Sequence, residues 1–292
     1  MGCSSFQEKG RLQMATTIYE PRGKAREYSP LALNPYSGCN HGCRYCYVPP
    51  IRRLTAKENL KVNARPDFLR SVKREAERMT DRSKQVLFSF MSDPYNELEP
   101  IEGLTRGCLQ ILLDNRIPVS ILTKSGTKAL VDIDLFKKFY RSIQVGATLT
   151  FSNGDDSRFW EPGAAEPFDR LEMLEALHRE GIKTWASFEP VIDPLQSLEL
   201  IENGLPWIDI YKIGKLNNAF PEIEKEICWP DFLEAAIKIL RKNKKAFYVK
   251  YDLRRACQGV KLYGNEVLQD EHNTPPFPAL KRSFDFNGNT PG

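Results

Sequence analysis

The sequence predicts an α/β fold, specifically a partial (β/α)6-type TIM barrel. First, short apolar segments alternate with amphipathic helical patterns from residue 66 onward, which is typical of a parallel sheet. Second, polar or cysteine-rich segments follow the expected strands, where a barrel collects its active-site residues. Third, 41% hydrophobic and 27% charged residues are typical of a globular protein, and no apolar run reaches the ~20 residues that cross a bilayer.

Apolar runs bounded by turn residues predict the strands. The second of them ends in Ser92-Asp93-Pro94, a turn sequence. Counting a first strand directly before the cysteine-rich segment gives about seven β/α units. The expected strands are 31–34, 86–91, 119–123, 143–151, 182–188, 208–213 and 247–250.

Apolar residues at helical spacing predict the intervening helices. Pro66 suits the first turn of the helix that follows it, and Cys108 falls on the apolar face of the next helix, as a small core residue. The expected helices are 66–79, 101–113, 128–140, 168–180, 195–203 and 231–242.

Three regions are expected along the chain. Residues 1–16 are expected to be a disordered N-terminal extension, 17–252 the barrel and 253–292 a C-terminal extension. Met14 would serve equally well as a start, which would make residues 1–13 an addition. Seven cysteines without a disulfide pattern favour the reducing cytoplasm.

The segment Cys39-Asn-His-Gly-Cys43-Arg-Tyr-Cys46 is the most informative part of the sequence. Its spacing, C-x3-C-x2-C with Tyr45 before the last cysteine, lets three thiolates converge on one metal centre. A structural zinc site requires four protein ligands, so three leave a position open for another molecule. A zinc knuckle or three unrelated thiols are the alternatives, and His41 is a possible further ligand or an ordinary polar loop residue.

This motif resembles the cluster loop of the radical S-adenosylmethionine (SAM) enzymes. The resemblance implies that Cys39, Cys43 and Cys46 hold three irons of a [4Fe–4S] cluster and that SAM chelates the fourth. It also implies reductive cleavage of SAM to a 5'-deoxyadenosyl radical that abstracts hydrogen from a substrate. A reductant such as flavodoxin or ferredoxin would supply the electron.

Further short segments are similar to those of the radical SAM branch related to spore photoproduct lyase, which is a DNA repair enzyme. The similarity covers roughly residues 17 to 250. The segments are Tyr19-Glu-Pro-Arg-Gly-Lys-Ala, Asn34-Pro-Tyr-Ser-Gly-Cys39, Ser92-Asp-Pro-Tyr95, Leu122-Thr-Lys-Ser125 and Glu161-Pro-Gly-Ala164. That enzyme carries a hydrogen-donating cysteine after its second strand, whereas the corresponding segment here, Phe88 to Asp93, has none. This departure puts the dimer-splitting reaction in doubt, whereas the radical chemistry that the resemblance implies does not depend on it.

Polar residues after the second and third strands are candidates for holding SAM. Ser92 or Asp93 could accept a hydrogen bond from the SAM ammonium group, although Asp93 could instead cap the turn before Pro94. Lys124 could neutralise the SAM carboxylate or a substrate phosphate, or could simply be an exposed lysine.

Later strand ends supply the remaining candidates. Thr150 and Ser152 could bind the ribose of SAM, or could be ordinary strand residues. Arg170 could reach SAM or pair with Glu161 to close a loop. Glu189 is a further cofactor-binding candidate, and Gly214 would let the backbone approach the adenine.

The charge distribution suggests a nucleic-acid base as the substrate, with DNA preferred. Two basic stretches stand out although the net charge is only +4: residues 44–65 and 241–255. The alternative explanation is that both basic stretches are simply solvent-exposed faces of the protein. Cys257, beside Arg254 and Arg255, could have a lowered pKa and donate hydrogen, or could simply pack.

Two other functions are compatible with the sequence. One is a radical SAM enzyme that acts on a peptide or a small metabolite. The other is a non-catalytic nucleic-acid-binding protein stabilised by a metal at the three cysteines.

Overall fold

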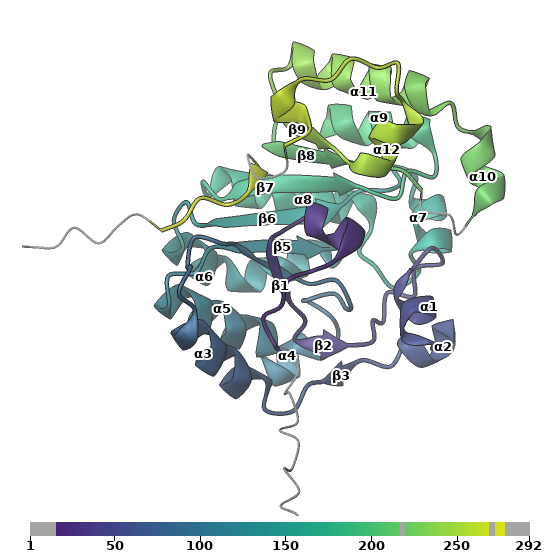
Figure 1. Cartoon of the computed structure of the whole chain (residues 1–292). Helices are drawn as coiled ribbons and strands as arrows, with labels where there is room; N and C mark the ends of the chain where they lie inside the picture. The colour runs from purple at the N-terminus through teal and green to yellow at the C-terminus, as the bar shows by residue number, and fades with distance from the viewer. Residues whose placement is uncertain (1–15, 217–219, 269–271, 278–292) are drawn as a thin grey trace, which may run out of the picture.

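A curved parallel sheet forms the centre of the computed structural model, which describes residues 16–216, 220–268 and 272–277. Its strands pair in chain order from one edge to the other (Figure 1). The seven strands are β1 (Leu31–Leu33), β4 (Val86–Phe88), β5 (Val119–Thr123), β6 (Ile143–Thr148), β7 (Lys183–Phe188), β8 (Ile210–Ile213) and β9 (Ala246–Val249). This open, all-parallel order confirms the predicted α/β partial barrel.

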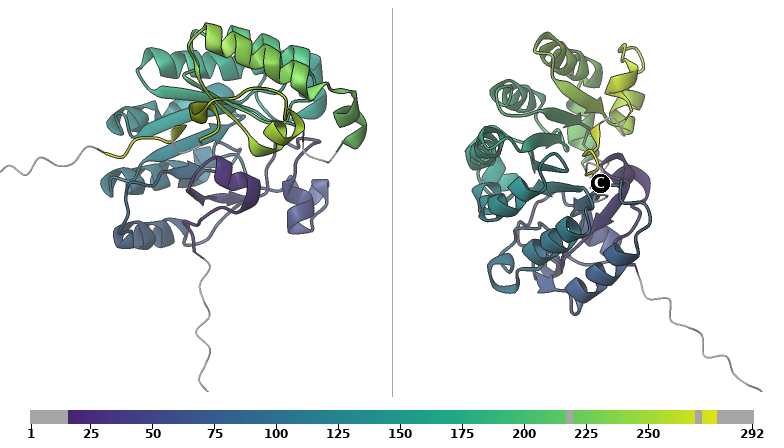
Figure 2. Two further views of the ribbon diagram at one scale, coloured as in Figure 1. Left: turned by 45° about the horizontal axis from the view of Figure 1, so that its top comes forward. Right: turned by 90° about the vertical axis from the view of Figure 1, so that its left-hand side faces the viewer.

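The longer helices that connect the strands lie on the outer side of this sheet, and the N-terminal segment lies on the inner side (Figure 2). The α-helices are α1 (Val48–Arg52), α2 (Ala56–Asn59), α3 (Phe68–Arg78), α4 (Glu99–Glu102), α5 (Leu104–Asp114), α6 (Ile133–Lys138), α7 (Gly154–Trp160), α8 (Pro167–Arg179), α9 (Pro194–Asn203), α10 (Pro221–Glu226), α11 (Trp229–Lys242) and α12 (Tyr251–Ala256). Three 3-10 helices are η1 (Gly23–Glu27), η2 (Gly126–Asp132) and η3 (Gly264–Glu266).

The sequence explains this layering. All six residues of β6 are buried, as is typical of a parallel strand covered on both faces. In α11, the buried residues recur at helical spacing and form one apolar stripe against the sheet. Asn153 and Asp193 cap α7 and α9 by accepting backbone N–H groups with their side chains.

The N-terminal segment closes the open side of the partial barrel. Tyr19 forms a bridge with Ala32 of β1 at one edge of the sheet. At the other edge, Glu27 accepts a 2.7 Å hydrogen bond from Tyr248 of β9. Residues 19–28 therefore span the gap between the first and last strands (Figure 1).

Some predicted elements differ in detail. The strand predicted over 143–151 ends at Thr148, and the helix predicted over 128–140 begins as the 3-10 helix η2. The antiparallel pair β2 (Tyr36–Ser37) and β3 (Asn63–Ala64) and the short helices α1 and α2 were not predicted.

The boundaries of the three expected regions can be compared with the structure only where residues are described. The expected boundary at residue 252 falls inside α12. Residues 1–15 of the expected N-terminal extension, and 269–271 and 278–292 of the C-terminal one, lie outside the described residues. Among the described helices, none is long and apolar enough to cross a membrane.

Candidate active site

A pocket opens at the carboxyl ends of the strands and has an empty volume of about 1000 Å³, its open mouth included. All three cysteines of the motif, Cys39, Cys43 and Cys46, line it. Four other predicted site residues also line it: Ser92, Asp93, Lys124 and Glu189. Residues that lie as far apart in the sequence as Cys39 and Glu189 thus meet in one cavity, where barrels place their chemistry.

The start of the cysteine loop is fixed by a close approach between backbones. Gly38 has φ +76°, and a Cβ there would lie 2.9 Å from the carbonyl carbon of Lys61 and closer still to its oxygen. Next to it, the Cys39 N–H donates a 2.7 Å hydrogen bond to Asn59. Only glycine suits this position, because it has neither a Cβ nor a penalty at positive φ.

Burial and the nearby Lys124 cation have opposite effects on the protonation of the three thiols. Desolvation raises the pKa of Cys39 to about 11, and it also raises the pKa values of Cys43 and Cys46. The Lys124 ammonium opposes this at all three thiols. Thiolates are the metal-binding form, so binding a metal here displaces protons.

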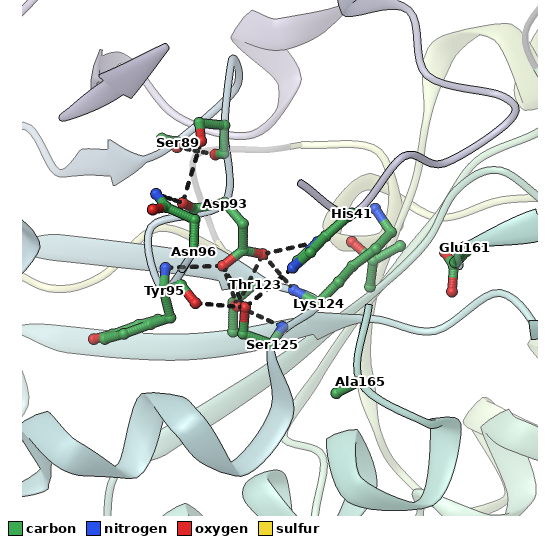
Figure 3. Close-up of polar contacts among 12 residues, drawn as sticks. His41, Ser89, Asp93, Tyr95, Asn96, Thr123, Lys124, Ser125, Glu161 and Ala165 are labelled. Atoms are coloured by element: carbon green, nitrogen blue, oxygen red, sulfur yellow. Dashed lines mark hydrogen bonds and ion pairs between the residues drawn. The ribbon is translucent and has the colours of Figure 1, made fainter. Parts of the chain in front are cut away.

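Asp93 is the centre of a buried hydrogen-bond network (Figure 3). One carboxylate oxygen accepts hydrogen bonds from the Tyr95 N–H at 2.9 Å and from the hydroxyls of Thr123 and Ser125 at 2.8 and 2.9 Å. The other accepts the Lys124 N–H at 2.7 Å. The geometry therefore matches the turn-capping alternative, and Asp93 fixes the ends of β4 and β5 relative to each other.

His41 connects the cysteine loop to this network. Its Nδ1 lies 3.7 Å from Asp93 Oδ2, and its Nε2 lies 3.3 Å from the Ser125 hydroxyl. Burial lowers the pKa of His41 against the influence of the Asp93 carboxylate, so the ring is neutral near pH 7. His41 thus ties the loop to the strand ends.

The segment after α7 packs against the other side of the cysteine loop. Gly163 donates a 2.8 Å hydrogen bond to the His41 carbonyl, and Arg44 donates one of the same length to the Trp160 carbonyl. Glu161 accepts a hydrogen bond from the phenol of Tyr45, the aromatic residue of the motif. The loop is therefore held from both sides.

Arg170 and Glu161 form the structural pair that the sequence left as one alternative. The Arg170 side chain is 1% exposed, and its other N–H groups donate to the carbonyls of Thr148 and Ala165. Arg170 does not line the pocket. Each of its three nitrogens donates to an acceptor within the protein, and the side chain lies outside the pocket lining, which favours the structural pair over a contact with SAM.

Three further candidates also lie away from the pocket lining. Thr150 is buried near Tyr45 and Glu161, and the Ser152 hydroxyl donates to Glu199 at 2.6 Å. At Gly214, a Cβ would lie 2.9 Å from the carboxyl carbon of Glu189. The absence of a side chain at Gly214 thus makes room for Glu189.

Cys257 behaves as a packing residue. It is 2% exposed and belongs to the main hydrophobic core. Burial raises its pKa to about 11, whereas a lowered pKa was expected from its arginine neighbours. That expectation is wrong, because desolvation outweighs any nearby positive charge.

Known proteins share this fold and sequence pattern. The family model of the radical SAM superfamily matches residues 33–203. The chain belongs to this superfamily. An uncharacterized protein of Methanocaldococcus jannaschii is 32% identical over 196 residues, which are 63% of this chain and 70% of that protein. An uncharacterized protein of Mycobacterium tuberculosis is 29% identical over 175 residues, 56% of this chain but only 50% of that protein.

Solved radical SAM structures have the same fold at low sequence identity. Spore photoproduct lyase complexed with dinucleoside spore photoproduct gives a TM-score of 0.57 at 11% identity, covering 82% of this chain and 80% of that one. Streptococcus suis SuiB bound to S-adenosylmethionine gives 0.58 at 14% identity, covering 81% and 54%.

The cofactors of this radical SAM protein are a [4Fe–4S] cluster and SAM. Together they supply the one-electron cleavage of SAM that yields a 5'-deoxyadenosyl radical. The donor set fits, since a [4Fe–4S] cluster would need several cysteine thiolates on the wall of one pocket. Cys39, Cys43 and Cys46 provide this, and Lys124 lies near enough to act on all three thiols.

Two residues that hold Glu189 in the pocket region were missed by sequence reasoning. Tyr28 lines the pocket from the N-terminal segment, and Lys250 pairs with Glu189 from the end of β9. The position of Lys250 at a strand end was a usable signal. Tyr28 has no local signal, because its site partner Glu189 is 161 residues away in the sequence.

Proposed function

We propose that this radical SAM enzyme abstracts hydrogen from a nucleic-acid base, in a thymine-type lyase, isomerase or modification reaction. The observation that carries the proposal is a group of exposed cations directly after the cysteine loop, on and around α1 and α2. In the part of the chain that the structure describes, none of these four has an acidic partner: Arg52, Arg53, Lys57 and Lys61. Unpaired cations beside a pocket favour a polyanionic substrate.

Aromatic side chains accompany these cations. Tyr47 lines the pocket and is 44% exposed, and Phe159 is 54% exposed. The Arg44 guanidinium lies 4.0 Å from the centre of the Phe159 ring. Exposed rings next to cations offer stacking surfaces for bases and are typical of single-strand binding sites. A base within a duplex would have to be flipped into the pocket.

The second basic stretch gives less support. Arg241 pairs with Glu266, Lys245 donates to the Ile208 carbonyl, and Lys250 pairs with Glu189. These three of its seven cations are used within the protein, whereas the four cations near α1 and α2 have no such partner among the described residues, so we place the proposed nucleic-acid surface at residues 44–61.

Within the proposed reaction, Ser92 and Lys124 hold SAM. Both line the pocket at its cysteine end, and Lys124 can pair with the SAM carboxylate. We further propose a one-electron donor such as flavodoxin or ferredoxin, and a cytoplasmic location, where thiols stay reduced.

The test is an anaerobic assay with the reconstituted protein, SAM and dithionite. Single-stranded thymine-containing DNA, ultraviolet-irradiated DNA, RNA and peptide mixtures are compared for stimulation of 5'-deoxyadenosine release, and digested products are analysed by mass spectrometry. Stimulation by DNA or RNA together with an altered nucleoside supports the proposal. Stimulation by peptides alone would replace it with the peptide alternative.

The Arg52→Gln/Arg53→Gln double variant tests the surface. Binding of an oligonucleotide should weaken, and its dependence on salt concentration should become shallower, because fewer counterions are released. Lys242→Gln/Lys244→Gln, which also removes two exposed charges, is the matched control. Equal losses in both pairs would remove the argument for this surface.

A further inference from the structure

A compact group of polar side chains forms the end of the pocket away from the cysteines. Tyr28, Ser187 and Glu189, from the end of η1 and from β7 and its end, line the pocket, and Lys250 at the end of β9 pairs with Glu189 without lining it. Tyr28, Ser187 and Lys250 are buried, and the Glu189 side chain is 12% exposed. Glu189 raises the pKa of Tyr28 and also that of Tyr47, where burial and the Cys46 thiol have larger effects, so Tyr47 lies between this group and the cysteines. The charges that act on the thiols include Lys124, Asp93 and Glu161.

Glu189 is held by two donors on the same oxygen. Its Oε2 accepts a 2.6 Å hydrogen bond from the Tyr28 phenol and pairs with the Lys250 ammonium. Burial, together with the Glu189 carboxylate, raises the pKa of Tyr28, so the phenol keeps its proton and remains a donor. Ser187, 2.8 Å from the Tyr28 oxygen, completes the chain.

The second oxygen of Glu189 is open to a ligand. Among the described residues, Oε1 accepts no hydrogen bond, although Glu189 lines the pocket. A carboxylate removed from water requires hydrogen-bond donors, and a buried ion pair is not needed for stability alone. The arrangement therefore presents a fixed acceptor to whatever enters this end.

The charge balance and shape of this end select the ligand. Lys250 already neutralises Glu189, so a cationic donor would leave an uncompensated positive charge, and a neutral N–H is preferred. One open oxygen matches a single donor, not the two adjacent donors of guanine. Tyr28 and Phe90, with ring centres 6.0 Å apart, and Tyr47 provide aromatic walls for a planar ring.

We propose that Glu189 recognises the ring N–H of a pyrimidine imide, as found in thymine and uracil, by accepting a hydrogen bond at Oε1. The imide N–H is more acidic than an exocyclic amino group and so makes the stronger bond to a carboxylate. This inference rests on the proposed function and names which bases that site takes.

The test measures binding without turnover. The protein carries its reconstituted cluster and SAM, no reductant is added, and fluorescein-labelled single-stranded heptanucleotides report binding by anisotropy. All have cytosine at the flanking positions, and the central base is thymine, N3-methylthymine, cytosine or adenine. With the wild-type protein, methylation of N3 should weaken binding about tenfold, because it replaces the donor and blocks the carboxylate.

Variants assign the effect to the residue. Glu189→Gln should reduce the difference between the thymine and N3-methylthymine oligonucleotides, mainly by weakening the binding of the thymine oligonucleotide, because the amide oxygen is a weaker acceptor than the carboxylate. Glu199→Gln, at an exposed carboxylate that does not line the pocket, should keep the tenfold difference. Iron content and thermal unfolding check that each variant is folded and loaded.

The outcomes separate the two proposals. Tight binding that is insensitive to N3-methylation in the wild-type protein overturns the assignment to Glu189 and leaves the nucleic-acid function intact. A preference for central cytosine or adenine overturns the imide assignment in favour of an amino-bearing base. Failure of every oligonucleotide to bind overturns the proposed function and this inference with it.

Discussion

Glu161 and Arg170 form an ion pair that is shielded from solvent, with Arg170 Nη2 2.5 Å from Glu161 Oε2 and side-chain exposures of 1% and 0% for Arg170 and Glu161. Glu161 also accepts a hydrogen bond from Tyr45, between two cysteines of the cluster loop. The pair therefore links the start of α8 to the loop that binds the cofactor, and its energetics can be tested separately from catalysis.

Arg170→Met should lower the free energy of unfolding by about 3–5 kcal/mol, because it leaves the Glu161 carboxylate buried without a partner. Arg158→Met is the control, since Arg158 is 59% exposed in its ion pairs and its loss should cost no more than about 1 kcal/mol. Urea denaturation under anaerobic, reducing conditions measures both. Equal effects would show that the buried pair has no special role.

Gly163→Ala should impair assembly of the cluster. A Cβ at this position would lie 2.9 Å from the Cα of His41, and closer still to the carbonyl oxygen of Asn40, so the cysteine loop must shift. Iron and sulfide per chain after reconstitution are the measurement. Gly264→Ala, where nothing lies within 4 Å, should load normally.

Cys43→Ala should abolish both the bound cluster and the release of 5'-deoxyadenosine, because one iron loses its protein ligand. In contrast, Cys257→Ala should retain SAM cleavage and product formation and should lose about 1 kcal/mol of stability as a small buried side chain is truncated. Loss of product with retained SAM cleavage in Cys257→Ala would restore it as a hydrogen donor.

Lys212 should make the free energy of unfolding increase as the pH rises from neutral into the alkaline range. Burial, with the Lys250 charge next, lowers its pKa from 10.5 to about 7. Between these values the unfolded chain binds a proton that the folded protein does not, so stability should rise with pH. The slope is at most about 1.4 kcal/mol per pH unit.

The difference between wild-type protein and Lys212→Met isolates this contribution. Denaturation from pH 7 to 9.5 should show the wild-type protein gaining stability relative to the variant. Lys242→Met, at an exposed lysine, should run parallel to the wild type. Parallel curves for Lys212→Met as well would mean that Lys212 keeps its ordinary pKa when folded.

The sheet and the cysteine site could be predicted because their signals are local. Parallel strands such as β6 are continuous apolar runs, and the three cysteines lie within eight positions. The positions of Thr150 and Ser152 were harder to predict, because the strand ends at Thr148. As a result, Thr148 rather than Thr150 lines the pocket. Periodicity gives the face of a strand but not the residue at which it stops.

The Glu189 end of the pocket could not be predicted in the same way. Tyr28 reaches Glu189 from 161 positions away, and Lys250 from 61. No local pattern carries such pairings, since they depend on which segment crosses the open side of the barrel. The sequence showed the carboxylate but not its two partners.

The crossing of the N-terminal segment also orders events during biosynthesis. Glu27 contacts Tyr248 across 221 positions, so this closure waits until the last strand has left the ribosome. The cysteine loop directly follows β1 in the sequence and is translated long before that point. The Glu189 end of the pocket is therefore completed last, and a chain that stopped before β9 would contain all three cysteines but lack Lys250, the partner of Glu189.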